Sequence, residues 1–237
     1  MICYFSFVVF GLLIINTSCK KDNQEDAIKD IDGNIYTAIT IGSQVWMVEN
    51  LKTTHYNDGT VIPNITDDDT WKNQSEDAYC NYDNLESNVP SNGRLYNWHA
   101  VHTGKLAPKG WHIATKAEWI TLFDYLENNG YAFEGNGDDI AKSLASDSGW
   151  QENTSIPGSI GYDQMGNNES GFTAVPSGFR FSDGTFQSKR YAAEFWSSTE
   201  HDLTNNPIGF QLAYSMSIIN EQVHLKTCGC AVRCLKD

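Results

Sequence analysis

The clearest structural signal in this sequence is an amphipathic period over residues 116–129, which predicts one substantial α-helix. Thr115 and Glu118 have the spacing of a capping box, in which a hydroxyl and a carboxylate each bind an unpaired backbone N–H. Apolar side chains follow at i, i+3, i+4 and i+7 on one face: Trp119, Leu122, Phe123 and Leu126. Gly130 then ends the helix. This apolar face needs a partner, so the rest of the chain decides the fold.

Short strands and turns surround this helix. Residues 35–41 alternate β-branched and smaller side chains, and Gly42-Ser43 turns the chain into residues 45–48, which predicts a β-hairpin. Residues 53–90 are rich in Asp, Asn and Thr and predict loop with short strands, with Asp67-Asp68-Asp69 as a solvated turn. Further strand candidates lie late in the chain, at residues 194–197, 209–213 and 231–235.

Two shorter helices are also expected. Leu95, Trp98 and Val101 are three residues apart and indicate a helix within residues 94–101. A second one is expected over residues 138–145, with Ile140 and Leu144 facing inward. The sequence shows no internal repeat and no second region of distinct amino-acid composition. Helices in the middle of many short strands predict a single α+β domain.

The N-terminus reads as a lipoprotein signal peptide. Residues 3–15 form a roughly 13-residue apolar stretch, which suits a signal peptide and is too short to span a bilayer. Thr17 and Ser18 are small, as a signal peptidase requires, and Cys19 is the expected site of lipidation, including palmitate. We therefore expect a signal peptide at 1–18, a lipidated tether at 19–29 and a folded domain at 30–237. An ordinary signal peptide with a coincidental cysteine is the alternative.

The acidic composition excludes some partners. The net charge is −14 and no basic stripe interrupts the sequence, so a phosphate backbone would be repelled and no nucleic-acid partner is expected. With 40% hydrophobic and 12% aromatic residues, the chain beyond the signal has enough apolar side chains for a substantial core.

Four cysteines remain once Cys3 and Cys19 are set aside: Cys80, Cys228, Cys230 and Cys234. In an exported protein they favour disulfides, and three pairings are open. The Cys228-Gly229-Cys230 spacing is too tight for an easy internal bridge, so we expect Cys80 to bond to the C-terminal cluster, with Cys234 as its partner. Binding of a soft metal such as Cu(I) by Cys228 and Cys230 is the alternative.

Eight short motifs follow one another between Asp30 and Asp237: Asp32-Gly33-Asn34-Ile35-Tyr36, Trp46-Met47-Val48-Glu49-Asn50-Leu51, Leu95-Tyr96-Asn97-Trp98, Gly110-Trp111-His112, Ala117-Glu118-Trp119, Asn168-Glu169-Ser170-Gly171-Phe172, Trp196-Ser197-Ser198-Thr199-Glu200 and Val232-Arg233-Cys234-Leu235. In this order they resemble the motifs of the Fibrobacter succinogenes major paralogous domain family of exported Bacteroidetes proteins. The resemblance implies a C-type-lectin-like fold, with two helices packed on small twisted antiparallel sheets and long irregular loops. Lys20-Lys21-Asp22 resembles the signal that sends such lipoproteins to the outer face of the outer membrane. The resemblance implies no catalytic residue. Ala107 stands at a position where a common variant of the family has a cysteine.

Ligand-binding candidates follow from residue chemistry. Tryptophans can stack on pyranose rings, and Trp98, Trp111, Trp150 and Trp196 are the candidates, whereas Trp119 belongs to the core. A cluster of carboxylates and amides could hold Ca²⁺ together with sugar hydroxyls: Asn167, Asn168, Glu169, Glu200 and Asp202. The acid-Pro-amide motif of sugar-binding C-type lectins is missing. His99 and His102 have the spacing of metal ligands, but no third ligand is identifiable, so we interpret them as surface histidines without a metal.

No motif of a hydrolase is present: the chain has no Gly-x-Ser-x-Gly elbow, no His-Glu-x-x-His and no phosphate-binding glycine loop. The sequence therefore favours a non-enzymatic lipoprotein at the cell surface that binds or adheres to a glycan or protein ligand. The first alternative is an enzyme, acting on extracellular polysaccharide or resembling the oxidase-like formylglycine-generating enzymes. A structural component of a surface assembly is the other.

Overall fold

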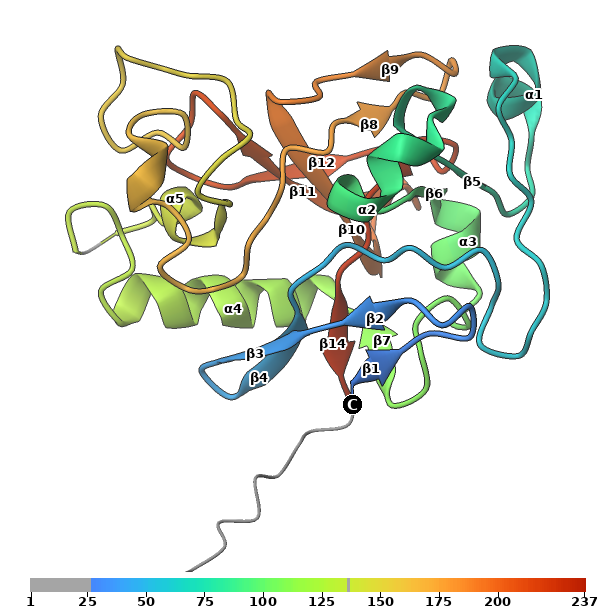
Figure 1. Ribbon diagram of the computed structural model, residues 1–237, viewed down its shortest axis with the longest axis horizontal. Helices are drawn as coiled ribbons and strands as arrows, with labels where there is room; N and C mark the ends of the chain where they lie inside the picture. The colour runs from blue at the N-terminus through green and yellow to red at the C-terminus, as the bar shows by residue number, and fades with distance from the viewer. Residues whose placement is uncertain (1–26, 136) are drawn as a thin grey trace, which may run out of the picture.

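The computed structural model describes residues 27–135 and 137–237 of the protein. The predicted signal peptide, the lipidation site at Cys19 and most of the tether lie outside these residues. No helix in the described part is long and apolar enough to cross a membrane. Small sheets with antiparallel strand pairing and a few helices make up the fold, as the α+β prediction requires (Figure 1).

The four-stranded sheet has the order β3-β4-β14-β7, formed by β3 (Ala38–Ile41), β4 (Gln44–Met47), β14 (Cys234–Lys236) and β7 (Trp111–Ile113). The predicted hairpin is confirmed as β3–β4, with Ile39 opposite Trp46. It begins later than expected because Ile35 and Tyr36 form β2 (Ile35–Tyr36), which pairs with β1 (Ile28–Lys29) in a separate two-stranded sheet. The C-terminal strand β14 lies between β4 and β7.

Two further sheets complete the domain. One has the order β5-β6-β13-β8-β9, formed by β5 (Tyr79–Cys80), β6 (Leu95–Asn97), β13 (Gly229–Cys230), β8 (Phe179–Arg180) and β9 (Phe186–Gln187). The other has the order β10-β11-β12, formed by β10 (Ala192–Glu200), β11 (Pro207–Ala213) and β12 (Asn220–Val223). Of the strand expected over 231–235, only Cys234 and Leu235 are in a strand, β14, because Ala231 forms an isolated bridge to Phe195 and the chain then changes sheet.

The long helix is confirmed as α4 (Lys116–Asn128), with both bonds of the capping box between Thr115 and Glu118 present. Its Trp119 is fully buried at the centre of an aromatic cluster. The Trp119 ring centroid lies 4.9 Å from Trp46, 5.7 Å from Phe172 and 5.5 Å from Phe210. The helix therefore ties the β3-β4-β14-β7 sheet to the β10-β11-β12 sheet through one core.

The shorter helical segments depart from the predictions. The expected helix over 94–101 starts as β6 and becomes helical only at α3 (Trp98–His102), because the Asn97 side chain caps that helix at Ala100 N. The helix expected over 138–145 is reduced to α5 (Ala141–Leu144), since Ala145 already forms an isolated bridge to Ala174. Residues 67–69, expected as a turn, instead start α1 (Asp68–Asn73), where Asp67 caps Thr70 N.

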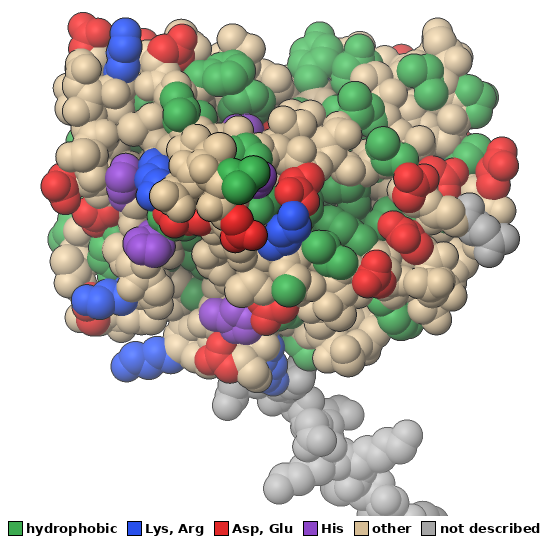
Figure 2. All heavy atoms as spheres, turned by 180° about the vertical axis from the view of Figure 1, so that it is seen from behind, with side chains coloured by type: hydrophobic (Ala, Val, Ile, Leu, Met, Phe, Trp, Pro, Cys, Tyr) green, Lys and Arg blue, Asp and Glu red, His purple; other side chains and the backbone are tan. Residues whose placement is uncertain are grey.

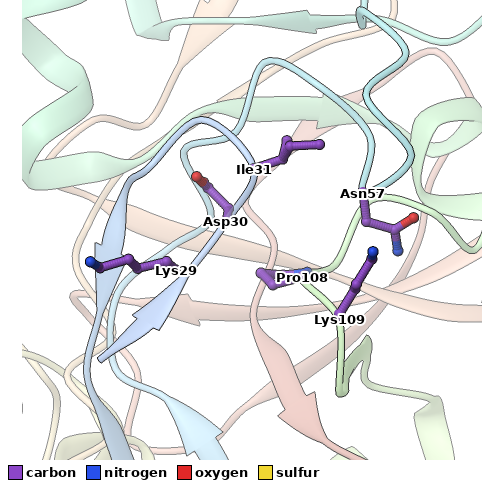
Figure 3. A pocket seen from close by; sticks show the side chains of 6 residues that line it. All are labelled: Lys29, Asp30, Ile31, Asn57, Pro108 and Lys109. Carbon is purple, nitrogen blue, oxygen red and sulfur yellow. The ribbon is translucent and has the colours of Figure 1, made fainter. Parts of the chain in front are cut away.

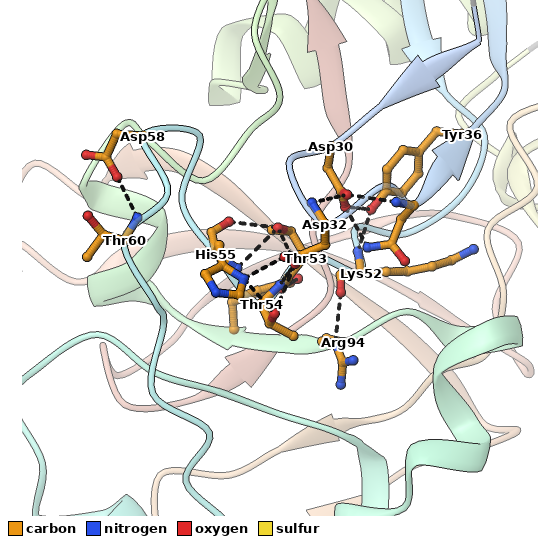
Figure 4. A network of polar contacts seen from close by, with 12 residues as sticks. Asp30, Asp32, Tyr36, Lys52, Thr53, Thr54, His55, Asp58, Thr60 and Arg94 are labelled. Carbon is orange, nitrogen blue, oxygen red and sulfur yellow. Dashed lines mark hydrogen bonds and ion pairs between the residues drawn. The ribbon is translucent and has the colours of Figure 1, made fainter.

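The remaining short helices lie in connecting segments: η1 (Tyr82–Asn84), η2 (Glu86–Asn88), α2 (Val89–Asn92) and η3 (Gln164–Gly166). The N-terminal strand pair is held to residues 52–55 by a polar network (Figure 4). The Asp30 carboxylate accepts a hydrogen bond from Tyr36 Oη at 2.6 Å, and Tyr36 Oη accepts one from Lys52 N at 2.9 Å. Asp32 binds Thr53 and His55 in the same network.

Arg233 is the polar centre of the core. It is fully buried, and its guanidinium donates to Asn50 Oδ1 at 2.9 Å and to the carbonyl oxygens of Met47, Phe172 and Thr173. The guanidinium carbon also lies 4.5 Å from the centroid of the Phe172 ring. A buried charge with this many acceptors fixes the relative position of three separate backbone segments.

Candidate functional site

A polar groove opens in the long irregular part of the chain between α5 and β10, the yellow and orange loops of Figure 1. It has a volume of about 980 Å³ and is lined by residues 147–154, residues 161–165 and Arg190. A second cavity of about 450 Å³ shares Asp147, Ser148, Gly149 and Arg190 with it, so the two are continuous around the 147–149 turn. Both volumes lie in the range of small-molecule sites. We call the two together the polar groove.

Trp150 anchors the wall of the polar groove. Its side chain is buried, and its indole Nε1 donates to Ser146 Oγ at 3.1 Å. The Gln164 side chain spans the groove floor, since its Oε1 accepts from Trp150 N and its Nε2 donates to Trp150 O, both at 3.1 Å. The two backbone segments approach so closely at Gly161 that a Cβ there would lie 2.4 Å from the Gln151 carbonyl oxygen. The groove is therefore preformed by internal contacts.

Lys142 supports the opposite wall from α5. Its ammonium group donates to the carbonyl oxygens of Tyr162 and Asp163, and burial lowers the pKa of this lysine. Asp163 has a φ of 48°, a conformation that non-glycine residues adopt at a cost. Its carboxylate is exposed, and no hydrogen bond or ion pair to it is present in the described residues.

Arg190 differs from the other three arginines of the chain. Arg94, Arg180 and Arg233 are buried and bind carboxylate or carbonyl oxygens. Arg190 is exposed, and within residues 27–135 and 137–237 its guanidinium takes part in no ion pair. Its backbone is nevertheless fixed: the N–H donates to Pro176 O, the carbonyl accepts from Gln151 N, and φ is 71°. A free guanidinium on a fixed backbone is available to a ligand.

Unusual backbone conformations concentrate around the polar groove. Five of the eight described non-glycine residues with positive φ fall in this part of the chain: Asp163, Asn168, Thr173, Ser188 and Arg190. Each costs about 1–3 kcal/mol and persists only where its surroundings impose it. For Thr173 the imposing group is Asn168, whose Oδ1 accepts from Thr173 N at 2.8 Å and whose Nδ2 donates to Thr173 Oγ1 at 2.9 Å.

The chemistry of the groove is that of hydrogen bonding to a polar ligand. Three carboxylates, one guanidinium and several amides are presented on an open surface: Asp147, Glu152, Asp163, Arg190, Gln151 and Asn153. Acidic side chains are also spread over the face opposite to that of Figure 1, without gathering in one patch (Figure 2). Vicinal hydroxyls offer both donors and acceptors, and carboxylate, amide and guanidinium groups match them.

The cluster expected from Asn167, Asn168 and Glu169 with Glu200 and Asp202 is not assembled. The Asn167 Nδ2 donates to Ser146 O and Ile160 O, and Asn168 binds Thr173, so both amides hold the loop that carries the groove. Glu169 and Asp202 are exposed, and Glu200 pairs with Lys226 at 2.6 Å. No group of three or more His, Cys, Asp or Glu side chains that could hold a metal ion occurs in the described residues.

The tryptophans expected in a glycan site are mostly buried. Trp98, Trp119, Trp150 and Trp196 are each at most 2% exposed, and Trp111 is half-buried. The assignment of Trp196 to ligand binding is therefore wrong: its indole Nε1 donates to Tyr96 O at 2.7 Å inside the core. His102 stacks on Trp98 with ring centroids 4.5 Å apart, which leaves the His99–His102 pair without a metal geometry.

The predicted disulfide is absent as well: Cys80, Cys228, Cys230 and Cys234 are free and buried. Strand β6 lies between β5, which carries Cys80, and β13, which carries Cys230, so about 10 Å separates those backbones and a disulfide would need less than about 7 Å. Cys234 belongs to a different sheet from Cys80. The strand order therefore overrides the expected pairing.

A smaller cavity of about 240 Å³ lies between the N-terminal strand pair and the Pro108–Lys109 turn (Figure 3). Two of its polar groups are already engaged: the Asn57 Nδ2 donates to Ala107 O, and the Asp30 carboxylate binds Tyr36 and Asn34. Its remaining charged side chains are two exposed lysines, Lys29 and Lys109. The polar groove, which is larger and presents unpaired side chains of both charges, is the better candidate.

Gln151, Glu152 and Arg190 were not singled out from the sequence. The available signal was a polar run directly after Gly149-Trp150, a glycine turn followed by an aromatic anchor. Nothing in the sequence connects Arg190 with that run, because the contact between Gln151 N and Arg190 O joins residues 39 positions apart, from 151 to 190.

The family model described as Fibrobacter succinogenes major domain matches residues 39–236. No curated protein and no solved structure matches the chain.

Proposed function

The chain belongs to the Fibrobacter succinogenes major domain family. Because this family resembles exported proteins and the sequence predicts a lipoprotein signal peptide, we propose that the protein is a surface-tethered binding module. The polar groove receives the ligand, and the ligand is a hydroxyl-rich molecule, with glycans as the leading class. The lipid on Cys19 would hold the domain at the outer membrane. The free guanidinium of Arg190, set among the free carboxylates of Glu152 and Asp163, is the observation that carries this proposal.

A C-type-lectin-like architecture is part of the proposal. It is supported by the pairing of the C-terminal strand β14 with β4 and β7, and by the long irregular segment that precedes β10. Folds of this kind place ligands on loops carried by a rigid scaffold. Fold alone does not assign function, so the site must be tested directly.

Binding is the role that we propose for this groove. The carboxylates of Asp147, Glu152 and Asp163 are exposed, and none of them takes part in an ion pair in the described residues. Side chains that are exposed and separately placed suit several simultaneous hydrogen bonds to a ligand.

Glycan-array binding by the full-length chain tests the proposal. We expect saturable binding to one sugar class, weakened about tenfold or more in Arg190→Ala and Glu152→Gln, since a lost charged hydrogen bond is worth about 1.5–3 kcal/mol. Asp202→Asn and Glu169→Gln are matched controls, because both residues are exposed and lie outside the groove lining. Binding should survive chelation, as the groove residues form no metal ligand set. Equal binding by Arg190→Ala and by the controls would rule out this groove.

A further inference from the structure

A thiol, an imidazole and a carboxylate meet where β12 turns into β13, away from the polar groove. Glu194 on β10 is fully buried, and its Oε1 lies 2.7 Å from His224 Nε2. The second carboxylate oxygen accepts from Gln211 Nε2 at 2.9 Å. Both oxygens of Glu194 therefore have a partner, which holds the carboxylate in one orientation toward the imidazole.

Cys228 completes the group from the other side of the turn. Cys228 N donates to Leu225 O at 2.9 Å, so residues 225–228 form a tight turn that brings Cys228 back beside His224. With Nε2 bound to Glu194, Nδ1 is the ring nitrogen that remains for the thiol. Burial by itself lowers the pKa of His224, but the Cys228 side chain and the Glu194 carboxylate outweigh it and raise the pKa to about 9. The ring is thus an imidazolium at neutral pH.

Packing fixes the ring between these two partners. The Trp196 ring meets it edge-on with centroids 5.5 Å apart, and the Phe179 centroid lies 6.3 Å away. A Cβ at Gly209 on β11 would lie 3.2 Å from His224 Cδ2, so the ring rests on bare backbone. The charged or titratable groups that face it are Glu194 from β10 and Cys228 from the turn, with Cys230 next to Cys228 on β13.

Accessibility distinguishes Cys228 from the other described cysteines. Cys228 is 4% exposed and the His224 side chain 13%, whereas Cys80, Cys230 and Cys234 are each 0% exposed. Burial raises the pKa of Cys80 and of Cys234 to about 12, and raises that of Cys230 as well. Three thiols are thus fully enclosed, whereas Cys228, although buried, keeps a small exposed fraction beside a cation.

We propose that Cys228 is a reactive-thiol site, whose sulfur reacts beside the His224 imidazolium with small electrophiles such as hydroperoxides. With hydrogen peroxide, the thiolate sulfur attacks one peroxide oxygen and the O–O bond breaks. The sulfur is oxidised to sulfenic acid and the peroxide is reduced, while the imidazolium proton passes to the leaving hydroxide to give water. Glu194 acts as a positioning residue that keeps the imidazole protonated and oriented.

Cysteine-resolved alkylation of the full-length chain tests this inference. The folded protein is treated with iodoacetamide between pH 5.5 and 8.5, and labelling at each cysteine is read by mass spectrometry. We expect Cys228 to react about tenfold or more faster than Cys80, Cys230 and Cys234, and to keep its rate at low pH, where a free thiol slows about tenfold per pH unit below about 8.5. Hydrogen peroxide should give a dimedone-reactive sulfenic acid at Cys228.

Two variants separate activation from mere exposure. His224→Gln should slow labelling of Cys228 and restore the steep pH profile of a free thiol, and Glu194→Gln should do so partially. His201→Gln, in the exposed β10–β11 turn, is the control. If a variant does not fold, the profile of the unaltered protein still decides: equal labelling of all four cysteines, or a free-thiol pH profile at Cys228, would overturn the proposal.

Discussion

Arg233 and Arg190 show how two regions of one domain use the same side chain differently. In the core between α4 and β14, the guanidinium of Arg233 binds four oxygens and stacks on Phe172. In the polar groove, Arg190 has a fixed backbone and a free side chain. A buried charge is committed to holding the fold, and a free one in a preformed groove is available for recognition. Removing the charge of Arg233 should therefore lower stability, whereas removing the charge of Arg190 should weaken ligand binding and leave stability almost unchanged.

The largest effect is expected from Arg233→Met. Four buried oxygens lose their donor, which should cost about 3–5 kcal/mol of unfolding free energy and lower the melting temperature by roughly 10 °C. Thermal unfolding followed by circular dichroism measures both. Arg190→Met is the matched control and should change the unfolding free energy by less than about 1 kcal/mol. Similar melting temperatures for the two variants would contradict the contrast.

The imidazolium of His224 should make the free energy of unfolding depend on pH. Because the contacts of His224 raise its folded pKa to about 9, its stabilisation is complete below the unfolded value near 6.5 and is lost as pH rises toward 9. The expected loss is of the order of 3 kcal/mol, measured by urea unfolding at pH 6 and pH 9. Glu194→Gln should flatten the profile. A stability that does not fall over this window would show that the imidazolium is not retained.

A smaller effect is expected where the two regions meet, at Asn168. Asn168→Ala removes the hydrogen bonds that impose a positive φ on Thr173, and should cost about 1–2 kcal/mol. Ligand binding should weaken severalfold although Asn168 does not line the groove, because the loop that carries the groove loses its order. Asn153→Ala, whose Oδ1 accepts only from Ser155 N, tests whether any loop amide has this effect on stability.

The smallest effect on stability has the opposite sign. Arg190→Gly relieves a φ of 71°, which glycine adopts freely, and should stabilise the fold by about 0.5–1 kcal/mol. The same change removes the free guanidinium and should abolish or strongly weaken glycan binding. Chemical denaturation and the binding assay, run on the same preparation, measure the two outcomes. A destabilised Arg190→Gly would mean that the side chain contributes to the fold after all.

The parts of the fold that were predictable are those set by neighbours in sequence. The capping box at Thr115 and the apolar face of α4 depend on residues a few positions apart, and both were predicted correctly. The disulfide between Cys80 and Cys234 was mispredicted because the sequence does not show which sheet each cysteine joins: Cys80 lies in β5 and Cys234 in β14, which belong to different sheets. The α3 helix starts four residues later than predicted, at Trp98 and not at Arg94, since tertiary pairing of Leu95–Asn97 overrode a helical spacing.

The candidate site was less predictable than the fold. The tryptophans are chemically suited to sugar stacking, but small sheets leave large gaps that aromatic rings fill, and four of the five are in the interior. The carboxylates and amides that were predicted to form one cluster make separate contacts in the structure. The sequence does not fix the distance between residues 167–169 and 200–202, so their separation could not be predicted. Arg190 could be assigned only once the pairing of its carbonyl with Gln151 N was known.

The position of β13 and β14 has a consequence for how the chain reaches its folded state. These strands come from residues 229–236, and each lies inside its sheet, between β6 and β8 in one and between β4 and β7 in the other. A chain that emerges N-terminus first therefore cannot close either sheet until its last residues are free, and such long-range pairing forms slowly. Both sheets therefore stay open until residues 229–236 are available, so the C-terminal end of the chain completes the fold.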